Sequence, residues 1–410
     1  MAKITAKTST KTIVLLGALD TKGAEYGFVK ECIEANGHRT LVMDVGVLGS
    51  PVIQPDVGRQ EVARAAKTEL SVLVERQDRG EAVVTMARGA AVLLPKLYAE
   101  GRLDGVIAMG GSGGSSVACA AMQALPVGVP KVMVSTVASG DVSGYVGVKD
   151  IVMMPSIVDV AGINKISREI FARAAGAICG MVEAEVPSGV DKPTIVASMF
   201  GNSTRAVETA REILEEAGYE VLVFHSVGTG GRTMESLIEA GLVDGVLDIT
   251  TTEWADELVG GVLTAGPTRL EAAARHGVPA VVAPACLDMV NFNAPDTVPE
   301  RFKGRIFYQH NPNVTLMRTT VEENRRLGEI LAEKLNLSTG PVTVLVPLKG
   351  FSMIDAEGGP FWCPEANAAF TAALKMNIRP DIPVVEVDGN VNDPEFAQRS
   401  ARTLLESIRG

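Results

Sequence analysis

An internal repeat is the feature that most constrains the fold of this chain. Four segments occur twice, in the same order along the sequence. The pairs are residues 11–17 and 194–197, 40–43 and 221–224, 103–107 and 243–247, and 128–132 and 277–281. Such an ordered repetition predicts two copies of one fold. We expect function to be divided at the places where the two copies differ.

Short apolar runs alternate with helical patterns in both copies, which predicts βαβ units and parallel sheets. The runs are continuous rather than alternating, as in strands that helices cover on both faces. We therefore predict an α/β protein of two Rossmann-like, three-layer αβα subdomains, related by the repeat and spanning residues 1–185 and 190–410. A chain of 410 residues is long enough to form two cores.

The predicted elements differ most between the copies in an insertion and a tail. The first subdomain has predicted strands near 12–18, 39–45, 104–109 and 131–136, an insertion at 51–100 with helices at 62–74 and 82–97, and a helix at 163–180. The second has predicted strands near 194–200, 220–225, 245–249 and 280–284. Beyond residue 300, strands at 305–309, 342–347 and 384–387 and helices at 321–335, 364–376 and 394–408 are expected to extend the second sheet.

The charge balance argues against nucleic acid as a partner. The net charge is −11 and the pI is about 5.1, whereas a protein that binds the phosphate backbone needs a basic surface. Five scattered cysteines without a C-x-x-C pair indicate reduced thiols. No signal segment and no apolar run of about 20 residues is apparent, so we expect a cytoplasmic protein without a membrane partner.

A glycine-rich segment after the third predicted strand gives the strongest local signal. Ligands of open parallel sheets lie at the carboxyl ends of the strands. Here the segment Gly110, Gly111, Ser112, Gly113, Gly114, Ser115 and Ser116 leads into a helix predicted at 117–124. Glycines permit positive φ angles and close approach of the backbone, and a helix N-terminus attracts anions. The segment therefore predicts an anion cradle, although no Gly-Lys-Ser/Thr of a Walker A loop follows.

Polar residues after the other strands of the first copy are candidates for the same site. Asp20 is a candidate ligand of Mg²⁺ or a ribose, and Lys22 a candidate phosphate contact. Asp44 lies 24 residues beyond Asp20, near the spacing of a ribose-binding acid. Thr136, Ser139, Gly140 and Asp141 follow the fourth strand and suit a phosphate or ribose, with Asp141 a second candidate for Mg²⁺. Each assignment has a structural alternative. Asp20 would be a helix cap, Asp44 would have a structural role, and residues 135–141 would form a polar loop stabilised by its own hydrogen bonds.

The second copy and the tail supply candidate catalytic residues. Arg232 lies in a second glycine-rich loop, residues 228–233, and suits a carboxylate or phosphate. His310, in a polar loop at a strand end, is a candidate general base, and Arg318 a second carboxylate clamp. No cluster with zinc-ligand spacing occurs in the sequence.

Several of these segments match a known family. The matching residues are Leu19–Gly23, Gly110–Gly114, His310–Thr320, Gly358–Phe361 and Asn392–Ala397, which together span almost the whole chain. In them the chain resembles the stand-alone bacterial relatives of the N-terminal ATP-binding domain of the plant tobamovirus replication inhibitor. The resemblance implies two Rossmann-like subdomains, ATP binding with a divalent cation, and a homodimer. It implies no particular reaction.

Together these observations predict a protein that binds ATP and Mg²⁺ on the first copy. We expect an ATP-dependent ligase or phosphotransferase that meets a small acidic or sugar-like metabolite in the cleft between the subdomains. Two alternatives stay open. One is a non-enzymatic ATP-binding module that controls an interaction, and the other is an ATP-independent enzyme whose glycine loop holds a sugar phosphate.

Overall fold

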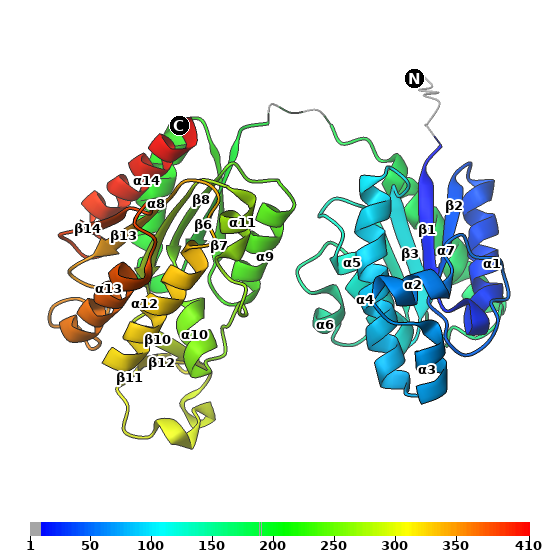
Figure 1. The fold of residues 1–410 in the computed structure, drawn as a ribbon, viewed down its shortest axis with the longest axis horizontal. Helices are drawn as coiled ribbons and strands as arrows, with labels where there is room; N and C mark the ends of the chain where they lie inside the picture. The colour runs from blue at the N-terminus through cyan, green and yellow to red at the C-terminus, as the bar shows by residue number, and fades with distance from the viewer. Residues whose placement is uncertain (1–9, 188, 190) are drawn as a thin grey trace. The chain divides into compact units, whose positions relative to one another are not determined.

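The chain forms two separate units, each built on its own parallel sheet. The computed structural model describes residues 10–187, 189 and 191–410. The units comprise residues 1–188 and 189–410, and each is described here by itself. Figure 1 labels their elements.

The first unit has a five-stranded sheet in which every strand pair is parallel. Its strand order is β2-β1-β3-β4-β5. The strands are β1 (Thr12–Gly17), β2 (Arg39–Asp44), β3 (Gly105–Gly110), β4 (Lys131–Ser135) and β5 (Val152–Pro155). The helices are α1 (Leu19–Ala35), α2 (Arg59–Ala65), α3 (Leu70–Arg76), α4 (Arg79–Ala99), α5 (Ser112–Gln123), α6 (Ser143–Val146) and α7 (Lys165–Glu183).

The second unit repeats this order and adds to it. Its six-stranded parallel sheet has the order β7-β6-β8-β9-β13-β14. The strands are β6 (Thr194–Met199), β7 (Glu220–His225), β8 (Gly245–Thr250), β9 (Ala280–Ala285), β13 (Val342–Pro347) and β14 (Val384–Val387). The helices are α8 (Thr204–Glu216), α9 (Thr229–Glu239), α10 (Glu253–Val259), α11 (Glu271–His276), α12 (Val321–Leu335), α13 (Pro364–Asn377) and α14 (Pro394–Arg409). The predicted α/β class, with two mainly parallel sheets flanked by helices, is confirmed.

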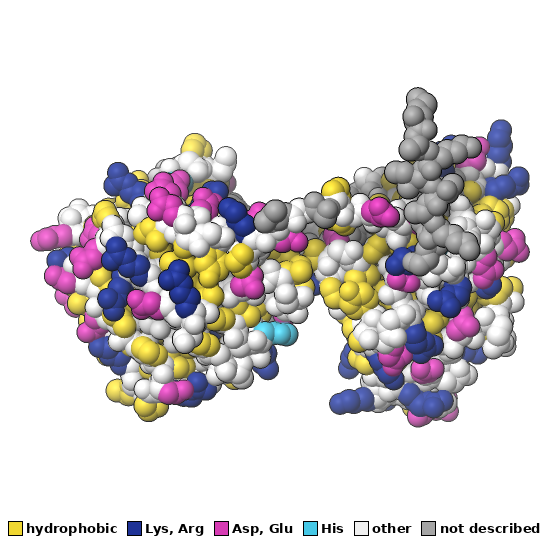
Figure 2. Space-filling model, turned by 90° about the horizontal axis from the view of Figure 1, so that it is seen from above, with side chains coloured by type: hydrophobic (Ala, Val, Ile, Leu, Met, Phe, Trp, Pro, Cys, Tyr) yellow, Lys and Arg dark blue, Asp and Glu magenta, His cyan; other side chains and the backbone are white. Residues whose placement is uncertain are grey.

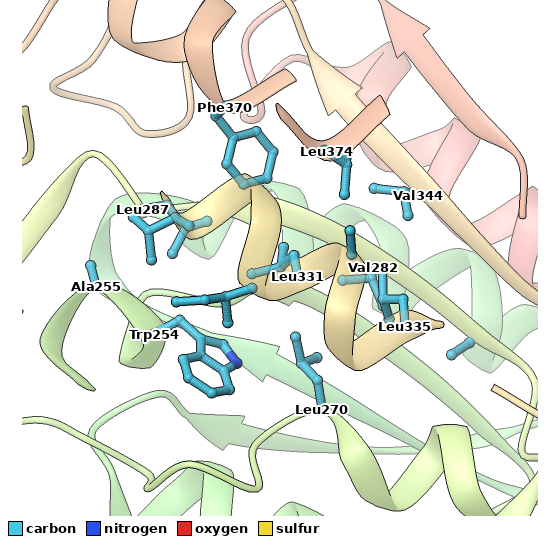
Figure 3. Packing of buried hydrophobic residues seen from close by; sticks show 14 of the residues in the cluster. Trp254, Ala255, Leu270, Val282, Leu287, Leu331, Leu335, Val344, Phe370 and Leu374 are labelled. Atoms are coloured by element: carbon cyan, nitrogen blue, oxygen red, sulfur yellow. The ribbon is translucent and has the colours of Figure 1, made fainter. Parts of the chain in front are cut away.

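Alternate residues of each central strand supply two cores, one on each face of the sheet. On β1, Val14 and Leu16 pack in a cluster with α2, α4 and α5, whereas Ile13 and Leu15 pack against α1 and α7. This is the two-residue period of a strand buried on both faces. In the second unit, Figure 3 shows Trp254, Leu331 and Phe370 gathered in one such cluster.

The tail contains a small antiparallel sheet that the sequence analysis did not predict. Strands β10 (Met289–Phe292), β12 (Val314–Arg318) and β11 (Phe307–Asn311) form it in that order. The predicted strand at 305–309 therefore does not extend the parallel sheet, although β13 and β14 do. The segment Asn311–Asn313 is the turn of the β11–β12 hairpin, in which Asn313 N donates to Asn311 Oδ1 at 2.9 Å. Such a side-chain bond favours a tight turn over a long loop.

In three further places the elements of the structure differ from the prediction. The helix predicted at 62–74 divides into α2 and α3, because the chain turns through Lys67 with φ of +60°. Strand β5 was not predicted. The helix predicted at 117–124 begins five residues earlier, at Ser112, inside the glycine-rich segment.

One helix of the described chain, α4, is long and apolar enough by composition to span a membrane. Half of its apolar window is buried, however, and Met86, Ala90 and Leu94 belong to the core of the first unit. These features are those of a core helix in an α/β domain. On the face shown in Figure 2, lysine and arginine side chains are interspersed with aspartate and glutamate.

Candidate functional site

The first unit contains a large cavity at the carboxyl end of its sheet. In the order β2-β1-β3, the chain leaves β1 toward one edge and β3 toward the other, and ligands of such sheets bind beside this switch point. The cavity lies there, with a volume of about 930 Å³, which is at the upper end of the ~300–1,000 Å³ of small-molecule sites. Its polar wall includes Asp20, Lys22, Gly111, Ser112, Gly113, Gly114, Thr136 and Asp159.

The glycine-rich segment is the N-terminal turn of α5. Gly111 is the N-cap residue and supplies no side-chain bond to the first amides of the helix, which have no intrahelical acceptor. Gly110, Gly111, Gly113 and Gly114 have no positive φ angle, so their expected role in permitting such angles was wrong. A Cβ atom added at Gly113 would instead lie 3.6 Å from Arg79 Nη2, and one at Gly111 would lie 3.6 Å from Thr136 Oγ1. Both partners line the cavity, so the missing side chains leave the helix N-terminus open to it.

Two residues of the segment have structural roles. Ser115 is fully buried, and its Oγ lies 2.6 Å from Ser135 Oγ, which joins α5 to the end of β4. Gly110 ends β3, and a Cβ atom there would lie 3.1 Å from the Cα of Gly114. Neither residue lines the cavity, so close packing explains both without a ligand.

Asp20 and Asp44, the two acids predicted to contact a nucleotide or its metal, have different surroundings. Asp20 lines the cavity; its Oδ2 accepts from Leu48 N at 2.8 Å, while its Oδ1 is buried without a hydrogen bond in the described chain. Asp44 is fully buried behind the cavity, and its Oδ1 accepts from Leu19 N at 3.0 Å and Gly46 N at 2.8 Å. Burial raises the pKa of Asp44. Asp44 thus connects the first residue of α1 with the segment after β2, which is a structural role, the alternative to a ribose contact.

Lys22 lines the cavity, and its ammonium group donates to the carbonyl oxygen of Val160. This bond connects the first turn of α1 with the loop after β5.

The predicted residues after β4 are split between two environments. Thr136 lines the large cavity and, with Ser139, a smaller pocket of about 350 Å³ beside it. Gly140 and Asp141 line neither of these. The Asp141 carboxylate accepts from Ser143 N at 2.9 Å, and hydrogen bonds from Ser143 lower its pKa.

A magnesium ion at this site would be coordinated mainly by the phosphates of a bound nucleotide and by water, with few protein ligands. Among the described residues, no group of three or more His, Cys, Asp or Glu side chains is arranged to hold a metal. Mg²⁺ on a nucleotide typically needs only one or two carboxylates, because phosphates and waters complete its shell. Asp20 lines the cavity and is a carboxylate of this kind, whereas Asp141 lines neither the cavity nor the smaller pocket.

The insertion between β2 and β3 supplies the residues that the sequence analysis missed. Leu73, Val74, Val83 and Met86 of α3 and α4 form an apolar wall. Arg79, the first residue of α4, lies beside Gly113 and has no hydrogen bond or ion pair in the described chain. The sequence contains a signal for this position, because Asp78 is a typical helix N-cap residue and Arg79 directly follows it at a helix start.

The second glycine-rich loop, by contrast, is filled by a side chain of its own unit. Glu253 Oε1 accepts from Gly228 N at 2.7 Å and from Gly231 N at 3.1 Å at the start of α9. A Cβ atom at Gly231 would lie 2.1 Å from Glu253 Oε2. A buried carboxylate therefore occupies the place at which a ligand anion was expected. The two glycine-rich helix starts therefore differ, because the N-terminus of α5 is open to a cavity and that of α9 is filled by Glu253.

Glu253 belongs to a buried cluster around Arg269. The guanidinium, 1% exposed, holds Glu253 through Nε at 2.8 Å, Asp248 through two N–H groups, and Glu235 at 3.1 Å. These carboxylates raise the pKa of Arg269 well above its ordinary value, while burial raises that of Glu235. One cation thus compensates three acids, and the cluster stabilises the unit only while the arginine is present.

The structure separates the three candidate catalytic residues. Arg232 is exposed in the first turn of α9, and His310 is exposed on β11, not in a loop at the end of the parallel sheet. Arg318 is 4% exposed, with Nε donating to Phe361 O at 2.7 Å and Nη1 to Thr319 Oγ1 at 2.8 Å. These bonds, with one from Nη2 to Asn367, make Arg318 a connector between β12 and residues 361–367.

A pair of buried acids, Asp288 and Asp355, lies beside Arg318 in the second unit. Asp355 Oδ1 lies 3.5 Å from Arg318 Nη2, and Asp288 Oδ2 accepts from Ser352 Oγ at 2.7 Å. Asp288 Oδ1 is buried without a hydrogen bond. Burial, reinforced at Asp288 by the charge of Asp355, raises the pKa of both acids.

We expect the free energy of unfolding of the second unit to fall as pH rises from 5 to 8. A raised pKa means that the folded state binds more protons than the unfolded state above pH ~4, so folding is favoured on the acidic side. Asp288→Asn should flatten this dependence. It should not abolish it, because burial also raises the pKa of Asp256 to about 7.

Urea unfolding followed by tryptophan fluorescence measures this effect, because both tryptophans of the chain, Trp254 and Trp362, lie in the second unit. The exposed Asp296→Asn is the matched control. An equally steep dependence in Asp288→Asn and the control would contradict the expectation.

Comparison with known proteins identifies the family of the chain. Residues 11–187 match the Uncharacterised protein family (UPF0261) N-terminal domain, and residues 192–408 match its C-terminal domain. The chain belongs to the UPF0261 family. A UPF0261 protein of Clostridium tetani is 51% identical over 397 residues, which cover 96% of this chain and 98% of that protein.

A plant protein is also related over the whole chain. The ToMV susceptible protein tm-1(GCR26) of Solanum lycopersicum is 38% identical over 427 residues, covering 98% of this UPF0261 chain and 56% of the tomato protein. The family resemblance predicted from sequence is thereby confirmed. A solved structure, UDP-N-acetylglucosamine 2-epimerase from Rickettsia bellii, aligns over 98% of both chains with 9% identity and a TM-score of 0.23, too low to support any inference.

Proposed function

We propose that the first unit binds ATP in its cavity and that the chain uses it, with Mg²⁺, to modify a small metabolite. The observation that carries this proposal is the open N-terminus of α5 at the β1/β3 switch point, beside a cavity of about 930 Å³. Free amides at a helix N-terminus favour phosphate. The glycine-rich start of α9 lies after a different strand, and there the Glu253 carboxylate accepts from two backbone amides, which supports the view that such a turn suits an anion.

The walls of the cavity suit the two ends of a nucleotide. Phosphates would lie on the amides of Ser112–Gly114, within reach of Lys22 and Arg79. The apolar surface of α3 and α4 would take the base, as cofactor sites commonly combine apolar walls with a few polar groups. Asp20 would hold Mg²⁺, which neutralises phosphate charge when bound.

A thermal-shift experiment tests the proposal. ATP at 100 times its Kd should stabilise the first unit by about 2.7 kcal/mol, more with Mg²⁺ than without it. Stabilisation by sugar phosphates but not by ATP would favour an ATP-independent enzyme. Stabilisation by ATP without turnover of any metabolite would favour a binding module. No shift with any nucleotide would exclude the ATP site.

Arg79→Met is expected to weaken ATP binding about 10- to 100-fold, because a hydrogen bond to a charged group contributes about 1.5–3 kcal/mol. Titration with a fluorescent ATP analogue measures this loss. Arg88→Met is the matched control, since Arg88 is exposed on the same helix but outside the cavity. Equal affinities of the two variants would remove Arg79 from the site.

A further inference from the structure

The smaller pocket adjoins the proposed nucleotide cavity and has a different chemistry. Its volume is about 350 Å³, and it is formed by the segments that follow β4 and β5. Thr136 and Asp159 line both the pocket and the large cavity, so they mark the boundary between the two spaces. A molecule in the pocket would therefore lie next to a ligand on the N-terminus of α5.

Hydroxyl groups dominate the lining of this pocket. Ser135, Thr136, Ser139 and Ser156 line it, together with Pro155, Ile157, Val158 and Asp159. Ser135 and Ser156 already bond within the protein, to Ser115 and to the carbonyl of Val158. Thr136 and Ser139 make no side-chain hydrogen bond in the described chain, which leaves both hydroxyls for a ligand.

The negative charge of Asp159 disfavours an anionic ligand in this pocket. The described residues that line it include no lysine, arginine or histidine, and Asp159 is their one charged group. An anionic molecule would face this carboxylate without a compensating cation, whereas an uncharged polyol would find hydroxyl partners. The pocket thus distinguishes between the acidic and the sugar-like metabolites that the sequence left open.

The loop after β5 holds Asp159 at the boundary. Val158 N donates to Ser156 O at 2.7 Å across Ile157, whose φ of +65° is rare for a β-branched residue. Asp159 Oδ1 accepts from Val160 N at 2.8 Å, and its Oδ2 has no hydrogen bond in the described chain. Lys22, in the first turn of α1, donates to Val160 O of the same loop and so connects this loop to the wall of the nucleotide cavity.

We propose that the smaller pocket binds an uncharged polyhydroxylated molecule that receives the terminal phosphoryl group of ATP, with Asp159 as the general base. This rests on the proposed function. The acceptor hydroxyl gives its proton to the Asp159 carboxylate, and its oxygen forms a bond to the γ-phosphorus. The bond from that phosphorus to the β-phosphate oxygen breaks, and ADP leaves with the electron pair. Catalysis of such transfers comes mainly from positioning and from electrostatic stabilisation of the phosphoryl group, and a carboxylate commonly accepts the hydroxyl proton.

The test measures ADP release from Mg-ATP by the full chain in the presence of matched acceptors. Glycerol, glucose and myo-inositol are the uncharged probes, and glycerate and gluconate are the anionic ones. At least one uncharged probe should raise ADP release above the rate in water and appear as a phosphate ester by ³¹P NMR. Stimulation by the anions alone would overturn the proposal. Absence of stimulation would also overturn it while ATP still stabilises the protein, whereas loss of ATP binding would count against the proposed function itself.

Two variants separate catalysis from binding at this pocket. Asp159→Asn should lower acceptor-dependent ADP release by about 100-fold or more, the usual contribution of a general base, and leave the ATP-induced thermal shift intact. Ser139→Ala should raise the KM for the acceptor with little effect on kcat. Glu69→Gln, an exposed acid of the same unit outside both spaces, is the control. Unchanged turnover in Asp159→Asn would exclude this residue as the base.

Discussion

Replacing Arg269 with leucine is expected to destabilise the second unit by about 3–5 kcal/mol, the cost of leaving buried charges uncompensated. Asp248, Glu253 and Glu235 would lose their common partner. For a domain of this size the loss corresponds to a melting temperature lower by roughly 10 °C. Tryptophan fluorescence measures it selectively, because both tryptophans lie in this unit.

Two further variants make this experiment specific. Arg275→Leu removes an exposed arginine whose bond to Glu271 lies on the surface of α11, so it should cost less than about 1 kcal/mol. Arg269→Lys keeps the charge but loses the bidentate bond to Asp248, and should be intermediate. If Arg269→Leu were as stable as Arg275→Leu, the cluster would have no part in holding Glu253 against α9.

Replacing Gly113 with valine is expected to abolish ATP-induced stabilisation of the first unit while leaving the melting temperature of the ligand-free protein nearly unchanged. A Cβ atom at Gly113 meets no backbone, and its nearest neighbour is Arg79 Nη2 at 3.6 Å. The fold therefore has room for the new side chain, but the side chain occupies the place of a phosphate. Calorimetry with and without Mg-ATP measures both effects.

Gly176→Val is the matched control for this substitution. Gly176 is exposed on α7 with nothing within 4 Å of an added Cβ atom, so the two variants share the change in helix propensity. The control should retain a shift of about 5–10 °C, as expected from about 2.7 kcal/mol. An equal shift in Gly113→Val would place any nucleotide site elsewhere.

The two copies differ in what lies at their glycine-rich helix starts. Each copy has a helix that begins with a glycine-rich turn, α5 after the third strand of the first unit and α9 after the second strand, at the sheet edge, of the second unit. In the first unit the turn opens on a cavity, and in the second Glu253 supplies an internal anion. We therefore expect the turn of the first copy to take a ligand anion, whereas in the second copy Glu253 bonds the turn within its own unit.

Local sequence patterns predicted most elements of the fold. The boundaries of α12, β13 and β14 agree with the prediction, because apolar runs and end signals are encoded by neighbouring residues. The capping box of Thr320 and Glu323 is present, with Thr320 N donating to Glu323 Oε2 at 2.7 Å. The pairing of β10 with β12 escaped prediction because it joins residues 289–292 with residues 315–318, which are distant in the sequence.

The sequence by itself determined the α/β class, the repeat and the glycine-rich helix start, because each depends on residues close together in the chain. Only the tertiary structure decided which glycine turn is open. That outcome depends on Glu253 and Arg269, which lie 22 and 38 residues beyond Gly231. Likewise, Arg79 of α4 and Asp159 of the loop after β5 line the same cavity as the α5 N-terminus. Spacing along a chain does not specify such contacts, since they form only when the strands are ordered side by side.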